Sequence, residues 1–234
     1  MSSSPNKNYE IEIKSLLGEQ AAADTLLARF EQLYPQAELV EESKQLNHYF
    51  SGSELVTLTQ SLQPHLSESQ YAQLKELSER AQSVSVRTRQ LNDTILFIVK
   101  ASIDDTTSEN GISRQEFEVP TPDLSLKQLD ELILDAGFSY QAKWSRQRRA
   151  FRVTHQEVPV VLSIDKNAGY GFLAEFETTV TDPAAADGAQ SALRSLMKQL
   201  NAVELSQDRL ERMFAHYNRH WQEYYGTDRT FVIE

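Results

Sequence analysis

The sequence predicts an α+β fold in which mostly antiparallel strands form a sheet or barrel and helices pack on its outside. Eight segments alternate apolar and polar residues with period two, as half-buried strands do. Other segments carry their apolar residues on one helical face. The chain of 234 residues has only 8 Gly and 7 Pro, and no low-complexity linker divides it. We therefore expect a flexible N-terminus over residues 1–8 and a single domain over residues 9–234.

The predicted strands are short and separated by turn residues. Asn92-Asp93 marks a tight turn between the third and fourth strands, and Asn167-Ala168-Gly169 turns the seventh into the eighth. The eight strands are Tyr9–Lys14, Gln45–Phe50, Ser83–Arg89, Thr94–Lys100, Ser113–Val119, Trp144–Val153, Val158–Asp165 and Tyr170–Val180.

Amphipathic helices are predicted between and after these strands. Glu19–Tyr34 and Ser125–Ala136 each place leucines and other apolar residues on one face. Asp182 followed by Pro183 is a typical helix start, which opens a helix to about Leu200. A last helix follows, so that C-terminal helices cover about residues 183–223.

A helical insertion is predicted over about residues 51–82. Leu55, Leu58 and Leu62 mark a first helical stretch, and a second follows Pro64. Two interpretations stay open. The insertion is either an αα-hairpin packed on the sheet or a lid or partner surface near the site.

Composition excludes several classes of function. Lys and Arg total 23 against 34 Asp and Glu, a formal charge of −11, which argues against a nucleic-acid partner held by a general basic surface. The sequence contains no Cys, which excludes disulfides, thiolate metal sites and Cys nucleophiles. No apolar run approaches the ~20 residues of a membrane-spanning helix, and the first residues do not form a secretion signal. We expect a cytoplasmic protein with no membrane partner.

The polar face of the predicted sheet is charged in strand after strand. In the first strand, Glu10, Glu12 and Lys14 point away from the apolar face. A sheet with one solvated face would explain one such strand, but here the charges recur in ordered pairs and triplets. Seven carboxylates and seven cations belong to this set: Glu10, Glu12, Glu116, Glu118, Asp165, Glu175 and Glu177, with Lys14, Arg87, Arg89, Lys100, Arg114, Arg146 and Arg148.

If these groups face each other inside a barrel, their mixture favours a particular ligand. Arg and Lys bind phosphate oxygens, and Arg does so with two parallel hydrogen bonds. Grouped carboxylates bind a hard divalent cation such as Mg²⁺ or Mn²⁺. A complex of polyphosphate with a metal ion would satisfy both halves of the face.

These same residues resemble the CYTH superfamily, the triphosphate tunnel metalloenzymes. Glu10-Ile11-Glu12-Ile13-Lys14 resembles the family's Glu-x-Glu-x-Lys motif near the N-terminus. Further matches follow in the family's order over about residues 9–180: Tyr49-Phe50, Val86-Arg87-Thr88-Arg89, Val99-Lys100, Arg114-Gln115-Glu116-Phe117-Glu118, Arg146-Gln147-Arg148 with Phe151, Asp165, and Gly169 to Glu177.

The resemblance implies an eight-stranded antiparallel β-barrel, or tunnel, that binds triphosphate and a divalent metal. It implies that Glu10, Glu12, Glu175 and Glu177 form the metal side, with Asp165 near the metal or its waters. Phosphates would be held by Lys14, Arg87, Arg89, Lys100, Arg114, Arg146 and Arg148. Glu10, Glu12 and Lys14 would be the catalytic residues. Either a carboxylate-bound metal or Glu10 would orient the attacking water, and Lys14 with the arginines would bind the charge that shifts as the bond breaks.

The family includes inorganic, thiamine and RNA triphosphatases and class IV adenylyl cyclases. No motif in this chain must bind adenine, so the sequence favours a triphosphatase acting on inorganic, nucleoside or thiamine triphosphate with Mg²⁺ or Mn²⁺. The alternative is a class IV adenylyl cyclase that makes cyclic AMP and pyrophosphate from ATP. Two classes without catalysis stay open, a module that binds polyphosphate or nucleotide and an interaction protein whose charges are solvated. Intact Glu pairs on the first and eighth strands favour an enzyme.

Overall fold

The computed structural model describes residues 9–52, 54–108 and 111–234, and within them all side chains except those of residues 9, 102–115 and 183. Its strands pair in one antiparallel sheet with the order β1-β8-β7-β6-β2-β3-β4-β5. The predicted α+β class with eight antiparallel strands and outer helices is confirmed. Strands β1 and β5 end this order, and the described residues contain no ladder between them, so closure of the barrel stays a prediction.

The chain divides into two compact units. Unit 1 comprises residues 1–43 and 146–234, and unit 2 comprises residues 44–145. Strands β2 (Glu38–Gly52) and β6 (Phe138–His155) each contribute residues to both units. The single domain expected over residues 9–234 stays a prediction.

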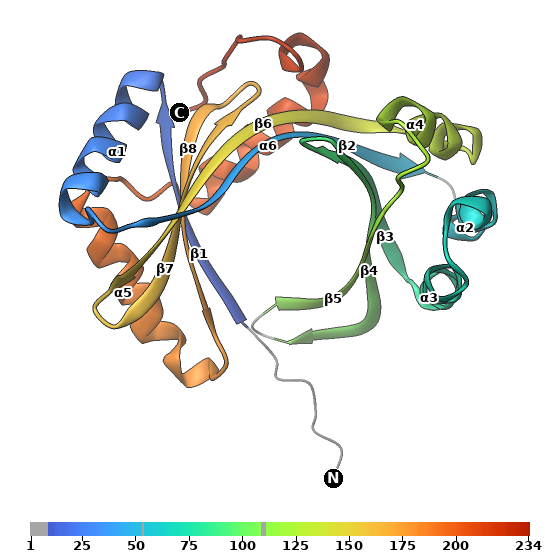
Figure 1. Cartoon of the computed structure of the whole chain (residues 1–234), viewed down its shortest axis with the longest axis horizontal. Coiled ribbons are helices and arrows are strands. Elements are labelled where there is room, and N and C mark those ends of the chain that lie inside the picture. Colours follow the sequence, from blue (N-terminus) through green and yellow to red (C-terminus); the bar gives the residue numbers. More distant parts are fainter. Residues whose placement is uncertain (1–8, 53, 109–110) are drawn as a thin grey trace. The chain divides into compact units, whose positions relative to one another are not determined.

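Unit 1 builds its sheet from β1 (Tyr9–Gly18), β7 (Val158–Asn167), β8 (Gly171–Val180) and residues 146–155 of β6. Helices α1 (Gln20–Leu33) and α5 (Ala186–Gln199) lie on the same side of β1, β7 and β8 (Figure 1). Their apolar faces bury Phe30 and Leu196 against Leu162 and Phe176. This packing leaves the opposite, charged face of the strands for the site.

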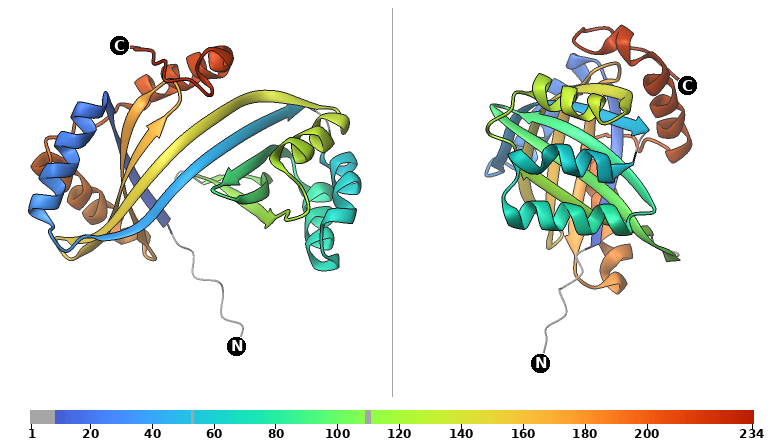
Figure 2. Two further views of the ribbon diagram at one scale, coloured as in Figure 1. Left: turned by 45° about the horizontal axis from the view of Figure 1, so that its top comes forward. Right: turned by 90° about the vertical axis from the view of Figure 1, so that its right-hand side faces the viewer.

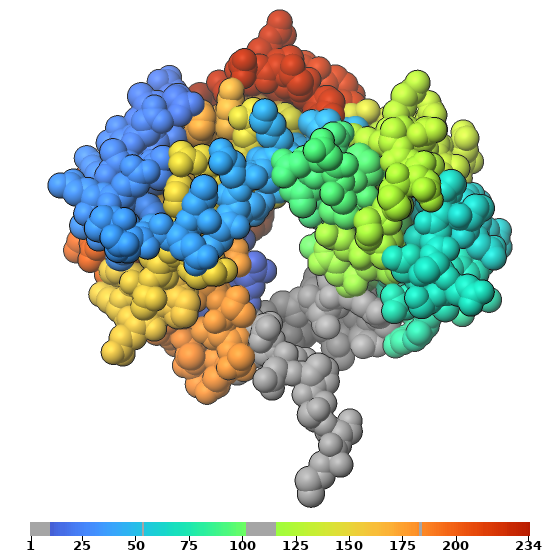
Figure 3. Space-filling view, in the orientation of Figure 1, coloured from blue at the N-terminus to red at the C-terminus, as the bar shows by residue number. Residues whose placement is uncertain are grey.

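Unit 2 contains β3 (Ser83–Leu91), β4 (Thr94–Ser108) and β5 (Gly111–Pro120), with helices α2 (Leu55–Leu62), α3 (Glu68–Arg80) and α4 (Leu126–Asp135) on one face. A short 3₁₀ turn over Gln63–His65 joins α2 to α3. The two helices lie side by side (Figure 2), and their side chains form one continuous surface (Figure 3). Because Leu58, Leu62 and Leu74 are fully buried with Phe97 and Val99, the insertion packs on the sheet as an αα-hairpin.

Local sequence signals explain where the helices begin. Ser67 and Ser125 each accept a hydrogen bond from the backbone three residues on, and the Gln at that position bonds back, which completes a capping box before α3 and before α4. Helix α6 (Gln207–Tyr224) begins after Ser206, whose side-chain oxygen accepts a hydrogen bond from Arg209 N. Among these helices of the described chain, none combines the length and apolar character needed to cross a membrane.

Several predicted boundaries differ from the structure. Strand β6 begins at Phe138, six residues before the predicted Trp144. Strand β2 begins at Glu38, seven residues before the predicted Gln45, because its first half carries no apolar–polar alternation. The segment after Asp182 begins as a 3₁₀ turn over Pro183–Ala185 before α5, although Asp182 Oδ1 accepts a hydrogen bond from Ala184 N at 2.9 Å, as a cap would.

The pairing of β1 with β8 depends on a close backbone contact. A Cβ on Gly171 would lie 2.0 Å from the carbonyl oxygen of Gly18, so only glycine fits there. The ladder also shifts register between Leu16 and Gly18. Together these features fix which residues of β1 lie opposite which residues of β8.

Candidate functional site

The charged face of unit 1 is built across the ladder between β1 and β8. Glu12 lies directly opposite Glu177, and Lys14 lies opposite Glu175. Since side chains alternate along a strand, Glu10, Glu12 and Lys14 all point to this face, away from buried Ile13. The register therefore puts two carboxylates opposite each other and a cation next to them.

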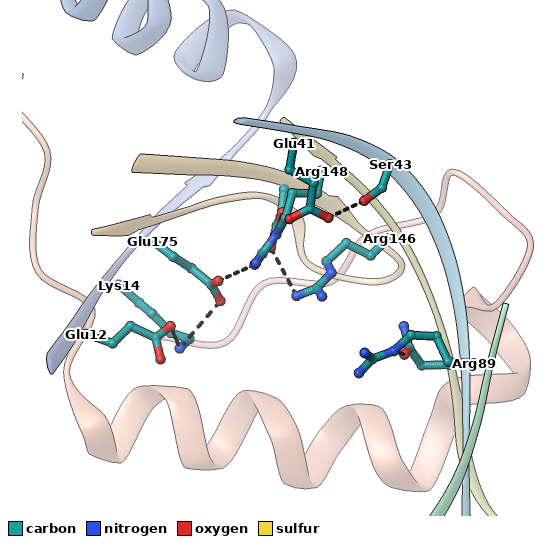
Figure 4. Close-up of polar contacts among 10 residues, drawn as sticks. Glu12, Lys14, Glu41, Ser43, Arg89, Arg146, Arg148 and Glu175 are labelled. Atoms are coloured by element: carbon teal, nitrogen blue, oxygen red, sulfur yellow. Dashed lines mark hydrogen bonds and ion pairs between the residues drawn. The ribbon is translucent and has the colours of Figure 1, made fainter. Parts of the chain in front are cut away.

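Lys14 links the two strands through ion pairs. Its Nζ contacts Glu12 Oε1 on its own strand and lies 3.4 Å from Glu175 Oε1 on β8. Glu175 Oε2 in turn pairs with Nη2 of Arg148, so one carboxylate lies between two cations (Figure 4). The side chain of Glu175 is only 13% exposed, which makes both contacts strong relative to a surface pair.

Arg148 is held by a buried carboxylate on the next strand. It faces Asp165 across the β6–β7 ladder and donates Nε to Oδ1 at 2.8 Å and Nη2 to Oδ2 at 2.6 Å. Arg146 Nη1 reaches the same carboxylate at 3.3 Å. Burial opposes the charge of Arg148, but hydrogen bonding to Asp165 and the charge of Glu175 outweigh it and raise its pKa. This pair is a buried charged anchor beside the more exposed Lys14 and Arg146.

The carboxylates of this face differ in how well cations neutralise them. Burial favours the neutral form of Glu175, but Lys14 and Arg148 outweigh it and hold its pKa below the usual range. Burial and the adjacent Glu175 raise the pKa of Glu12. Burial and a hydrogen bond with Glu10 raise the pKa of Glu177 to about 7. Negative charge is thus crowded on the side formed by Glu10, Glu12 and Glu177.

These carboxylates fit a divalent metal of a particular kind. Within the described part of the chain, no group of three or more acidic or histidine side chains converges on one point. Mg²⁺ usually keeps several waters and is bound by one or two carboxylates together with substrate phosphates. Glu12 and Glu177 supply these two carboxylates, so the pair suits a metal ion that is bound together with a phosphate group of the substrate.

Unit 2 carries a second charged face on β2, β3, β4 and β5. Arg89 faces Asn47 across the ladder and donates Nε to its Oδ1 at 2.7 Å. Arg87 lies with its guanidinium carbon 4.5 Å from the centroid of the Tyr49 ring and donates Nε to Ser85 Oγ at 3.1 Å. Both guanidinium groups are therefore oriented before any ligand binds.

Acidic side chains of β5 neutralise part of this second face. Lys100 Nζ lies 3.2 Å from Glu116 Oε2, and Arg89 Nη1 lies 3.5 Å from Glu118 Oε2. Side-chain exposure is 43% for Glu116 and 38% for Glu118, so solvent screens both pairs. An anionic ligand can displace such partners at little cost.

The structure groups the predicted site residues by unit. Arg114 lies in β5, but its side chain is outside the described side chains, so its predicted role stays a prediction. Unit 2 brings together Arg87, Arg89 and Lys100. Unit 1 brings together Glu10, Glu12, Lys14, Arg146, Arg148, Asp165, Glu175 and Glu177.

Sequence reasoning missed polar residues of β2 that support both faces. The charge of Glu41 acts on Arg148, and Ser43 donates to Glu41 Oε1 at 2.5 Å. Asn47, which holds Arg89, is the third of this set. These residues occupy alternate positions of one strand, and that polar period-two pattern was the signal available in the sequence.

A dependence of stability on pH follows from Glu177. Its pKa is about 7 in the folded chain against an ordinary 4.5, so between these values the folded state binds more protons than the unfolded state. The free energy of unfolding should therefore fall as the pH rises from about 5 to about 8. For a fully buried group, this pKa difference would correspond to a fall of about 3 kcal/mol in the free energy of unfolding. Because Glu177 is only half-buried and solvent screens its charge, we expect a fall of about 1 kcal/mol.

The neighbouring carboxylates do not reverse this sign. The raised pKa of Glu12 acts in the same direction, and the lowered pKa of Glu175 acts only below the ordinary range of a Glu. Urea titrations in metal-free buffer should show the fall in the wild type and a flatter profile in Glu177→Gln. Glu31→Gln, on the exposed side of α1, is the control. Equal slopes for all three proteins would contradict the expectation.

The sequence and the fold were compared with those of known proteins. The CYTH domain model matches residues 8–210. Solved structures similar to the chain include the following three. A protein of Vibrio parahaemolyticus named "putative adenylate cyclase" is 16% identical, with a TM-score of 0.53 over 88% of this chain and 98% of that one.

The other two structures come from archaea. A conserved hypothetical protein of Pyrococcus furiosus is 16% identical, with a TM-score of 0.52 over 83% of this chain and 92% of that one. The PH1819 protein of Pyrococcus horikoshii is 18% identical, with a TM-score of 0.52 over 89% and 99% of the two chains. These likenesses show a shared fold. A search of the curated proteins found no match.

Proposed function

Because the chain belongs to the CYTH family, we propose that it is a metal-dependent triphosphatase that hydrolyses the terminal phosphate of an inorganic or organic triphosphate. One observation carries the proposal. On a single sheet face of unit 1, a facing pair of carboxylates, Glu12 and Glu177, lies beside the cations Lys14, Arg146 and Arg148. This is the division of charge that a complex of metal and polyphosphate requires.

Glu12 and Glu177 would hold Mg²⁺ or Mn²⁺, with Glu10 and Glu175 beside them and Asp165 fixed by Arg148. When bound, the metal neutralises phosphate charge and lowers the pKa of a coordinated water. Because Asp165 is fully buried and its two oxygens accept from Arg148 and Arg146, we expect it to orient those arginines rather than bind metal directly.

The cations of this face differ in how deeply they are buried. Arg148, with a side chain 14% exposed, is fixed by Asp165 and Glu175. Lys14 and Arg146, with side chains 25% and 24% exposed, are more exposed than Arg148, so on this face a phosphate reaches them more easily. We expect Arg87, Arg89, Lys100 and Arg114 to bind further phosphate oxygens. Phosphoryl transfer depends mainly on such positioning and charge neutralisation.

The proposal has a direct test in product analysis. The purified protein is incubated with inorganic triphosphate, ATP or thiamine triphosphate, each with Mg²⁺ or Mn²⁺, and the products are separated by ion-exchange chromatography. We expect orthophosphate and the corresponding diphosphate, and no turnover in EDTA. Cyclic AMP and pyrophosphate as the main products from ATP would instead establish the cyclase, and binding without turnover would establish a non-catalytic module.

We further propose that the protein acts in the cytoplasm without a membrane or nucleic-acid partner, because its formal charge is −11 and its sequence contains no apolar run long enough to span a membrane.

A further inference from the structure

Unit 2 contains a buried carboxylate on the face opposite its phosphate-binding cations. Asp130 of α4 is 3% exposed and lies in a region otherwise packed with apolar side chains. It accepts hydrogen bonds from Thr88 Oγ1 at 2.7 Å and from Tyr140 OH at 2.7 Å, and His48 Nδ1 lies 2.6 Å away. One helix residue thus contacts side chains of three strands.

Such a group is costly unless its partners are well placed. Burial of a carboxylate in an apolar region destabilises the charged form by several kcal/mol. Here burial raises the pKa of Asp130, but hydrogen bonds from His48 and Thr88 outweigh it and leave the pKa below the ordinary value. The lowered pKa favours the carboxylate form of Asp130, and hydrogen bonds to a carboxylate are stronger than those between neutral groups.

The partners of Asp130 are next to the residues that hold the cations. His48 and Thr88 are directly opposite each other in the β2–β3 ladder. The adjacent pairs of the same ladder are Tyr49 opposite Arg87 and Asn47 opposite Arg89, and their side chains point to the other face. Asp130 contacts His48 and Thr88 on one face of the sheet. It therefore also fixes the backbone that carries Arg87 and Arg89 on the other face.

We propose that Asp130 is a positioning residue for substrate, which sets the spacing and direction of Arg87 and Arg89 by holding Thr88 and His48 from the opposite face of the sheet. The inference rests on the proposed function, since it concerns how phosphate oxygens are bound. Arg87 stacks on Tyr49, and Arg89 is bonded to Asn47, so both cations depend on the same ladder segment. A shift of β3 against β2 would move both guanidinium groups together.

Thr88 allows a test by nearly isosteric substitution. Thr88→Val keeps the volume and removes the hydroxyl that donates to Asp130, whereas Thr88→Ser keeps the hydroxyl and removes a methyl group. We expect Thr88→Val to weaken equilibrium binding of inorganic triphosphate about tenfold and to raise KM more than it lowers kcat, because placement of a binding group is lost. Thr88→Ser, which keeps the hydroxyl, should bind inorganic triphosphate within about twofold of the wild type.

Val86→Ala is the matched control for stability. Val86 is fully buried on the same face of β3 and neighbours Arg87, but no hydrogen bond joins its side chain to Asp130. Calorimetric binding is measured well below the Tm of every variant. Val86→Ala should lower Tm and leave triphosphate affinity within about twofold of the wild type. A loss of stability alone therefore does not change the measured affinity.

The outcomes separate this inference from the proposed function. If the wild type binds triphosphate and Thr88→Val binds it equally well, or if Val86→Ala weakens binding as much, the positioning role is wrong and the triphosphatase proposal stands. If the wild type neither binds nor hydrolyses any triphosphate, both fall. Weaker binding in Thr88→Val alone, with recovery in Thr88→Ser, supports the inference.

Discussion

Glu12→Gln is expected to lower kcat for triphosphate hydrolysis by about 10²–10³-fold, the size of effect seen when one electrostatic contact to a transition state is removed. The amide keeps the size of the side chain but carries no charge, so one of the two facing carboxylates of β1 and β8 is lost. Metal affinity should fall with it, because an amide is a much weaker ligand for Mg²⁺ or Mn²⁺.

The fold should tolerate this substitution. Glu12 has a side chain 32% exposed, and its partner Lys14 keeps Glu175 at 3.4 Å. Glu38→Gln is the control, because Glu38 is 65% exposed and pairs only at the surface with Arg152. Activity is measured as orthophosphate release over a range of Mn²⁺ concentrations. Nearly unchanged activity in Glu12→Gln would remove Glu12 from the catalytic residues.

Arg148→Ala is expected to have the largest effect on stability, about 3 kcal/mol in the free energy of unfolding. The substitution leaves Asp165, whose side chain is 1% exposed, with only the longer contact to Arg146 at 3.3 Å. A buried carboxylate with too few partners costs most of its desolvation energy. For a chain of this length, Tm should fall by about 6–12 °C.

Arg152 provides the control on the same strand. It lies on β6, is 57% exposed and forms an ion pair with Glu38 at 3.3 Å, so Arg152→Ala should change stability by less than about 0.5 kcal/mol. The double variant Arg148→Ala, Asp165→Ala removes both partners and should recover part of the loss. Equal stability of Arg148→Ala and Arg152→Ala would contradict the anchoring role of the buried pair.

The alternation of charge along strands could be predicted from the sequence because side chains of a strand alternate between two faces. This period places Glu10, Glu12 and Lys14 together whatever the partner strand is. The position of Glu12 opposite Glu177 could not be predicted, because it depends on the register shift between Leu16 and Gly18 and on the contact at Gly171. The local sequence pattern determines which residues of a strand share one face of the sheet, whereas the residues that lie opposite them on the neighbouring strand depend on tertiary contacts.

Two features of the chain were hidden from sequence reasoning for other reasons. The first half of β2 places its apolar residues Leu39 and Val40 next to each other rather than in alternation, so the strand was predicted to begin too late, and Glu41 and Ser43 were missed. An Asp in the middle of an amphipathic helix is ordinarily interpreted as solvent-exposed, whereas Asp130 is buried by hydrogen-bond partners from distant strands. Such partners are brought together only by folding.

The carboxylates and cations of the unit 1 face are expected to hold a metal ion and a triphosphate at the same time. Crystals soaked with Mn²⁺ and a non-hydrolysable imido analogue of triphosphate test this expectation directly by anomalous diffraction. We expect a manganese peak within coordination distance of Glu12 and Glu177, with phosphate oxygens on Lys14 and Arg146. Manganese bound elsewhere, or an analogue that contacts none of these side chains, would contradict the account.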